Sequence, residues 1–123
     1  MLDDRLHIKL IDFGLARTTD DSNVAENYSF CGSPIYIAPE TLLGAKYDKR
    51  ADFYALGVLL YEMVIGFSPF NVKSADKMLL EKTKKEILFP STISPSSKEL
   101  IQMLIKTDPH QRTTEIPELA RYV

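Results

Sequence analysis

The sequence has 123 residues, of which 45% are hydrophobic and 26% are charged. This composition fits one globular domain and excludes a disordered chain, in which hydrophobic residues would be scarcer. The net charge of -2 provides no broad positive field, which argues against nucleic acid as a partner.

Three further features exclude secretion and a membrane span. The chain has a single cysteine, Cys31, so an internal disulfide cannot form, and we expect a packed, inert thiol in a reducing compartment. The first ten residues include acidic side chains where a secretory signal would be basic. The apolar stretch from Phe53 to Ile65 is shorter than the roughly 20 residues of a membrane-spanning helix. We therefore expect an intracellular protein.

The first third of the chain is expected to be a strand followed by loops. The apolar run His7 to Ile11 predicts a short β-strand, which ends at Asp12-Phe13-Gly14, where glycine permits a sharp change of direction. The polar residues 18–27 have neither a strand nor a helix period, which predicts an exposed loop. Pro39 is expected to begin a short helix that ends at Gly44.

The remainder of the chain is expected to be helical. Asp48 is a suitable N-cap for a helix over residues 49–65, which Gly66 would terminate. Because this helix is apolar on nearly every face beyond Asp52, we expect it to be buried. Three further helices are predicted: a charged surface helix over 74–84, a helix from Ser94-Pro95 through Lys106 with Leu100, Ile101, Leu104 and Ile105 buried, and a short helix over 114–122.

Two triplets carry a resemblance to a known family. Asp12-Phe13-Gly14 and Ala38-Pro39-Glu40 resemble the two ends of a protein-kinase activation segment. Each triplet alone is weak evidence. Their order and separation argue against a chance match, and so do three longer runs: FCGSPIYIAPE, DKRADFYALGVLLYEM and DPHQR. The chain resembles the eukaryotic serine/threonine protein kinases, and the sequences of its motifs are most similar to those of the AGC group.

The resemblance covers essentially the whole chain and implies a mainly α fold. Residues 1–123 would form part of a protein kinase domain, with an activation segment over 12–40 and the helical part of the C-terminal lobe over 49–123. The expected architecture is the lower half of that lobe: a short β-strand, the activation segment and about four helices around a buried central helix.

The resemblance also assigns roles within the activation segment. Asp12 would hold the Mg²⁺ that bridges the phosphates of ATP, while Phe13 would pack toward the other lobe and Gly14 would let the loop change direction. An activating kinase would phosphorylate Ser29, and Arg17 would pair with that phosphate. An unmodified serine and a solvated surface charge remain the alternatives for the last two residues.

A second group of residues matches the substrate-binding side of the family. Ser33, Pro34, Ile35 and Tyr36 would face the residue that follows the phosphorylated one in a protein substrate, and Ser33 favours a serine or threonine acceptor. Ile35 replaces the glutamate that is usual in the AGC group, which removes one acidic contact. Glu62 matches the carboxylate that receives a substrate arginine, with an internal salt bridge as its alternative.

The remaining matches are structural. Ala38 and Pro39 belong to the second triplet, and its Glu40 would form a buried ion pair with Arg112 that ties the activation segment to the lobe. Asp52 matches an aspartate that hydrogen-bonds the backbone of the catalytic loop. Two apolar residues match the base of the column beneath the adenine, namely Leu59 and Met63.

The 123 residues do not contain the groups that carry proton transfer in kinases. The sequence has no glycine-rich loop, no strand lysine paired with a helix glutamate, and no catalytic loop, since Met1 would start just past that loop. We therefore expect this polypeptide alone to be inactive. We also expect it to be poorly soluble or molten, because apolar faces that normally meet the rest of the domain would be bare.

Two functions are consistent with these residues. The chain is either part of an active kinase, which transfers the γ-phosphate of ATP to a protein serine or threonine, or a non-catalytic binding module that presents its 74–84 helix and 67–70 loop. We favour the kinase, because a binding module has no physical need for a magnesium-binding aspartate at position 12.

Overall fold

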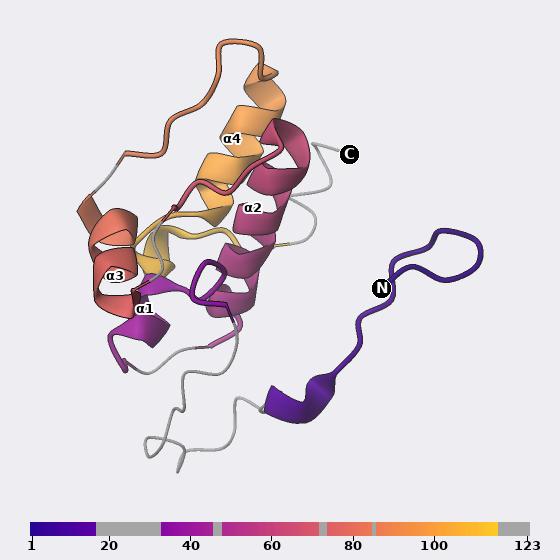
Figure 1. The fold of residues 1–123 in the computed structure, drawn as a ribbon, viewed down its shortest axis with the longest axis horizontal. Helices are drawn as coiled ribbons and strands as arrows, with labels where there is room; N and C mark the ends of the chain where they lie inside the picture. Colours follow the sequence, from indigo (N-terminus) through magenta and orange to yellow (C-terminus); the bar gives the residue numbers. More distant parts are fainter. Residues whose placement is uncertain (17–32, 46–47, 72–73, 85, 116–123) are drawn as a thin grey trace.

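The computed structural model describes residues 1–16, 33–45, 48–71, 74–84 and 86–115, and these residues are mainly helical (Figure 1). They form α1 (Pro39–Leu42), α2 (Arg50–Ile65), α3 (Ala75–Lys84) and α4 (Pro95–Leu104), with 3-10 helices at Phe13–Leu15 and Pro109–Gln111. No β-sheet forms in these ranges. The predicted helix over 114–122 falls outside them from residue 116 onward.

The N-terminal residues form an arm that lies apart from the helices (Figure 1). The prediction of a strand from His7 to Ile11 is wrong, because the backbone makes only one antiparallel bridge, between Leu2 and Ile8. A strand needs a partner along its length and a core beneath its apolar side chains. Ile8 and Leu10 are exposed in this arm, so neither condition is met.

Helix α2 begins one residue later than predicted and ends where predicted, so that its N-cap residue is Lys49 rather than Asp48. The carboxylate of Asp48 accepts a hydrogen bond from the backbone N–H of Arg50 at 2.8 Å, which satisfies a donor at the start of the helix. At the other end, Gly66 has a φ of 91° and donates to the carbonyl of Glu62 at 2.8 Å. Only glycine takes up this left-handed conformation without strain, so the helix ends there.

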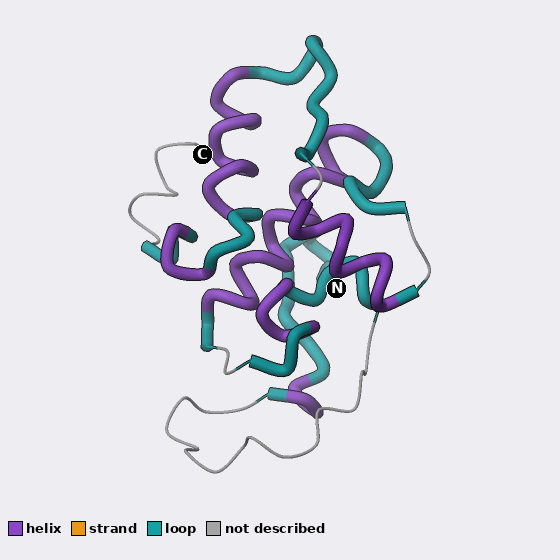
Figure 2. The backbone as a smooth tube through the Cα atoms, turned by 90° about the vertical axis from the view of Figure 1, so that its left-hand side faces the viewer, coloured by secondary structure: helices purple, strands orange, loops and turns teal. Residues whose placement is uncertain are grey.

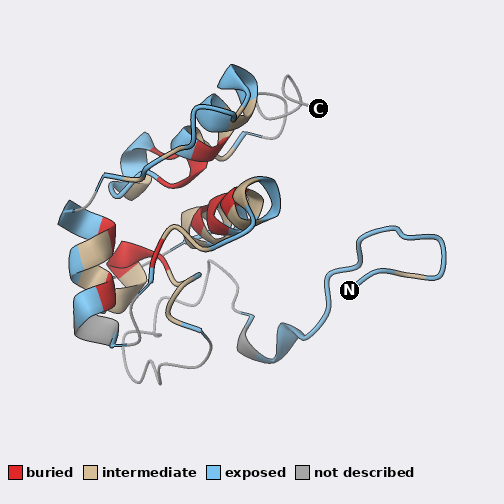
Figure 3. Cartoon of the chain, turned by 45° about the horizontal axis from the view of Figure 1, so that its top comes forward, coloured by how far each residue is buried: buried red, intermediate tan, exposed pale blue. Residues whose placement is uncertain are grey.

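Helices α2 and α4 pack against one another (Figures 1 and 2), and Figure 3 shows buried residues along the sides that face each other. The opposite face of α2 is bare: the exposed fractions of Leu59 and Met63 are 44% and 70%. The central helix is therefore buried along one face only. The core contains Ala38, Tyr54, Val58, Tyr61, Phe70, Met78, Ile101, Leu104 and Ile105.

The close approach of α2 and α4 depends on Gly57. A Cβ atom at this position would lie 2.7 Å from Cβ of Leu104 and 3.3 Å from the backbone nitrogen of Ile105. Neither atom is the end of a flexible side chain, so a methyl group would push the helices apart.

Gly57→Ala therefore tests the packing by the sign of its effect. Helix propensity alone predicts that alanine stabilises the helix by about 0.8–1.0 kcal/mol. Overpacking costs about 1–3 kcal/mol, which offsets or exceeds this gain, so we expect a net loss of up to about 2 kcal/mol in a denaturant titration of the protein that contains these residues. A gain in stability would show that the helices are not in close contact at this residue.

The prediction of a surface helix over 74–84 is wrong for one face of α3. Met78 and Lys82, four residues apart and so on the same side, are 0% and 4% exposed.

Helix α4 begins as predicted, with the hydroxyl of Ser94 accepting from the N–H of Ser97 at 3.1 Å, but it ends at Leu104 rather than Lys106. None of the helices in the described ranges is long and apolar enough to cross a bilayer.

Candidate functional site

The four residues expected to face a substrate form a turn directly before α1. The backbone N–H of Tyr36 donates to the carbonyl of Ser33 at 3.2 Å, and Pro34 occupies the second position of this turn, where its fixed φ fits. Ala38 has an extended backbone, as expected before a proline, and is 1% exposed. Residues 33–37, which we call the substrate-facing loop after the role expected for them, are thus followed by a residue anchored in the core.

Glu62 on α2 contacts this loop through Tyr36. The phenol hydroxyl donates a hydrogen bond to Oε2 of Glu62. This hydrogen bond raises the pKa of Tyr36, and partial burial and the negative charge of Glu62 act in the same direction. Within the described ranges Glu62 takes part in no ion pair, so its alternative assignment, an internal salt bridge, is not seen there.

Lys82 on α3 contacts the same loop from the core side. Its ammonium nitrogen Nζ donates to the carbonyl oxygens of Pro34 at 2.9 Å and Ile35 at 2.7 Å, and also to that of Ile37. Burial lowers the pKa of Lys82 to about 7, while the negative charge of Glu40 acts in the opposite direction. Sequence reasoning missed this residue. The available signal was its spacing of four from Met78, which places a charge on the apolar side of the helix.

Glu40 and Arg112 form a bidentate ion pair in the core. Arg112 Nη1 lies 2.7 Å from Glu40 Oε1, and Nη2 lies 3.1 Å from Oε2. The other guanidinium N–H groups donate to the carbonyls of Arg50 and Lys106, so every donor of the side chain is used. The pair therefore joins α1 to the start of α2 and to the segment after α4.

Asp12 and Phe13 lie in the exposed arm, and the structure does not bring them together with the substrate-facing loop (Figure 1). Asp12 has a φ of 62° and its Oδ1 accepts from the N–H of Gly14 at 3.3 Å. No cluster of three or more His, Cys, Asp or Glu residues occurs among the described residues. A single carboxylate nevertheless suits Mg²⁺, which proteins often hold through one or two carboxylates plus substrate phosphates.

Other expected site residues are either exposed or not described. Asp52 on α2 is exposed, as are Leu59 and Met63 farther along the same helix. These three side chains are therefore accessible to other polypeptide. Arg17, Ser29 and Cys31, with the loop over 18–27, lie outside the described residues.

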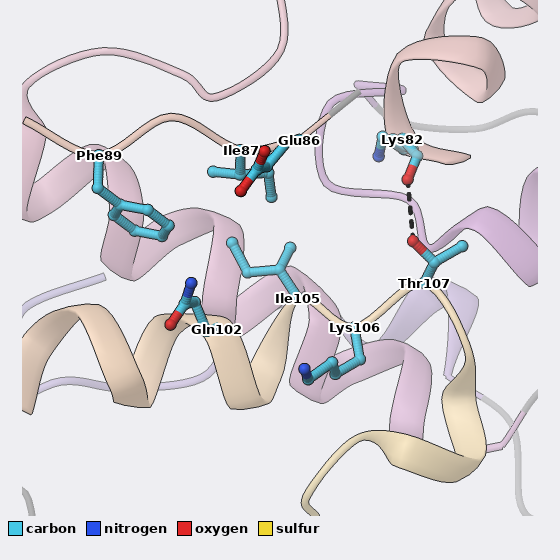
Figure 4. A pocket seen from close by; sticks show the side chains of 8 residues that line it. All are labelled: Lys82, Glu86, Ile87, Phe89, Gln102, Ile105, Lys106 and Thr107. Atoms are coloured by element: carbon cyan, nitrogen blue, oxygen red, sulfur yellow. Dashed lines mark hydrogen bonds between the residues drawn. The ribbon is translucent and has the colours of Figure 1, made fainter. Parts of the chain in front are cut away.

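Two cavities are found among the described residues, and the larger one reaches the substrate-facing loop at Ile35. The larger, of about 530 Å³, is lined by Ile35, Tyr61, Phe67, Ser68, Pro69, Phe70, Asn71, Glu86 and Leu88. The smaller, of about 210 Å³, lies between the end of α3 and the segment after α4 (Figure 4). At its edge the hydroxyl of Thr107 donates to the backbone carbonyl of Lys82 at 3.0 Å.

Comparisons with a protein-family model and with curated proteins both match this chain to protein kinases. The family model described as protein kinase domain matches residues 1–122. The RAC-beta serine/threonine-protein kinase of Homo sapiens is 41% identical over 123 residues, which cover 100% of this chain and 25% of that protein. Serine/threonine-protein kinase YPK2/YKR2 of Saccharomyces cerevisiae is 39% identical over 112 residues, 91% of this chain and 16% of that protein. The chain thus spans a quarter or less of the length of these relatives.

Proposed function

The chain belongs to the protein kinase family, among relatives that are serine/threonine kinases, and we propose that it is the activation segment and lower C-terminal lobe of such an enzyme. The complete enzyme transfers the γ-phosphate of ATP to serine or threonine side chains of an intracellular protein. The rest of its kinase domain supplies the nucleotide-binding lobe and the catalytic loop.

The observation that carries this proposal is the way in which the substrate-facing loop is held. The buried pair of Glu40 and Arg112 fixes the chain just after the loop. Tyr36 joins the loop to Glu62 on α2, and Lys82 joins it to α3. A loop attached to three helices can present a fixed surface to a protein substrate, and catalysis by kinases depends largely on such positioning.

The proposed roles of individual residues follow the family pattern. Asp12 would hold Mg²⁺ in the complete domain, where the metal ion neutralises charge on the phosphates of ATP. Glu62 would receive a basic side chain of the substrate beside the loop. Phosphorylation of Ser29 by another kinase would add negative charge to the activation segment, and Arg17 would pair with it.

Glu62→Gln in the full-length protein tests this assignment with two peptides that differ only by arginine or alanine near the acceptor serine. We expect the KM for the arginine peptide to rise about tenfold, since charge-assisted hydrogen bonds contribute about 1.5–3 kcal/mol. The KM for the alanine peptide should change little. Initial rates of phosphate transfer from ATP at several peptide concentrations give both values.

Tyr36→Phe is the matched control, because it removes the hydrogen bond to Glu62 and keeps the carboxylate. This variant should retain the preference for arginine. Failure of the wild-type full-length protein to phosphorylate any serine or threonine peptide would contradict the proposed function. An unchanged arginine preference in Glu62→Gln would contradict only the role given to Glu62.

A further inference from the structure

Lys82 places a cation inside the protein at the back of the substrate-facing loop. The residue is 4% exposed, and the centroids of the Tyr54 and Phe70 rings each lie 5.0 Å from its Nζ atom. A buried ammonium group is costly unless hydrogen-bond acceptors surround it. Here the acceptors are the backbone carbonyls of Pro34, Ile35 and Ile37.

The three carbonyls converge on one point, and an ammonium group has three N–H donors. The number of donors therefore equals the number of loop carbonyls that Nζ contacts. Without the cation, three carbonyl dipoles would point at one another in a space flanked by aromatic rings, and the turn would have to rearrange. The conformation of the loop thus depends on a side chain that does not itself belong to the loop.

The backbone of Lys82 is held as well. Its carbonyl accepts the hydrogen bond from the Thr107 hydroxyl at 3.0 Å, at the edge of the smaller cavity (Figure 4). This contact ties the end of α3 to the segment that follows α4. Because the backbone of Lys82 is fixed, the ammonium group at the end of its side chain can move little. The loop that this group contacts is restrained in turn.

We infer that Lys82 is a positioning residue, which sets the conformation of the substrate-facing loop and thereby the affinity for the protein substrate. This inference rests on the proposed function, in which residues 33–36 face the substrate. Because Lys82 is 4% exposed, it would act through the loop and not by contact with the substrate. Its loss is expected to act on peptide binding more than on the chemical step.

The protonation of Lys82 supplies an independent readout. Glu40 on α1 favours the cation, and Tyr54 on α2 is kept neutral because burial raises its pKa. The guanidinium group of Arg112 also contacts the ring of Tyr54, at 5.0 Å from its centroid. Two further charged residues, Glu86 and Lys106, line the smaller cavity beside Lys82. Burial lowers the pKa of Lys82 to about 7. A neutral amine has only two N–H donors and cannot satisfy three carbonyls.

This pKa has opposite consequences for the affinity for peptide, which should fall as the pH rises, and for the stability of the fold, which should increase. The ammonium fraction falls from about 90% at one pH unit below the pKa to about 10% at one unit above it, so the KM for peptide should rise with pH. In the unfolded chain the same amine keeps its proton up to a pKa near 10.5, so the unfolded state binds more protons between about 7 and 10.5 and stability increases with pH there.

The test compares Lys82→Met with Lys84→Met in the full-length protein. Methionine retains the length and apolar contacts of the lysine stem and removes the donors, whereas Lys84 is an exposed lysine on the same helix. We expect Lys82→Met to raise the KM for peptide about tenfold at pH 6.5, with kcat and the KM for ATP within about twofold of wild type. Lys84→Met should resemble wild type.

The pH profile separates positioning from a merely structural role. Between pH 6 and pH 8, the KM for a peptide without titrating groups should rise several-fold in the wild-type protein and in Lys84→Met, and should be flat in Lys82→Met. If Lys82→Met does not fold, the wild-type profile decides: a rising KM for peptide at constant KM for ATP supports the inference, and a flat profile overturns it.

Two further outcomes are distinguishable. An active wild-type protein whose Lys82→Met variant matches Lys84→Met in peptide KM and pH profile would overturn the inference and leave the proposed function intact. A wild-type protein that transfers no phosphate would overturn the proposed function, on which the inference depends.

Discussion

Replacing Arg112 with alanine is expected to destabilise the full-length protein by about 3–5 kcal/mol, because the variant leaves the carboxylate of Glu40 buried without its cation. The same change also removes donors to the carbonyls of Arg50 and Lys106. For a domain of kinase size this loss corresponds to a fall in Tm of about 6–20 °C. Thermal unfolding followed by circular dichroism measures it.

Arg50→Ala is the matched control. Arg50 forms an ion pair with Asp48 at 3.4 Å, but both side chains are partly exposed, and such pairs contribute about 0–1 kcal/mol. The double variant Glu40→Gln/Arg112→Ala should lose less than the sum of the two single variants, since it leaves no unpaired charge. Equal melting temperatures for Arg112→Ala and Arg50→Ala would show that the buried pair does not support the fold.

The second large effect is expected for Asp12→Asn, which should lower the kcat of the full-length kinase by about a hundredfold or more. Asparagine is nearly isosteric with aspartate but does not carry the negative charge that Mg²⁺ prefers. It can also accept the hydrogen bond from Gly14 and tolerates the φ of 62° at this position. The local fold should therefore survive, and the melting temperature should be close to that of the wild type.

Asp4→Asn provides the comparison for this variant, because Asp4 is an exposed aspartate of the same arm. It should retain wild-type kcat at saturating ATP and Mg²⁺. If Asp12→Asn kept the activity of Asp4→Asn, Asp12 would not be the residue that holds the metal ion.

The elements that could be predicted from sequence are those whose signals are local. Asp48 lies one residue before the N-cap of α2 and accepts from the N–H of Arg50, Gly66 ends α2 in a left-handed conformation, and Ser94 caps the start of α4. The ion pair of Glu40 and Arg112 joins residues 72 positions apart, and only the family resemblance could suggest it.

The errors come from interactions that are not local. The run His7 to Ile11 has a strand-like composition, but strand formation depends on a partner, and the described residues supply only the bridge between Leu2 and Ile8. Lysine is rarely buried, so the sequence alone places Lys82 on the surface. Its three carbonyl acceptors come from a loop more than 40 residues away, as the separations of 48, 47 and 45 positions show.

The most direct measurement is phosphate transfer from [γ-³²P]ATP to an arginine-containing serine peptide, by the full-length protein and by a polypeptide of these 123 residues. The full-length protein should label the peptide on serine in a Mg²⁺-dependent reaction, and the shorter polypeptide should give only background, because its sequence contains no glycine-rich loop and no catalytic loop. Labelling by the shorter polypeptide, or none by the full-length protein, would contradict the account.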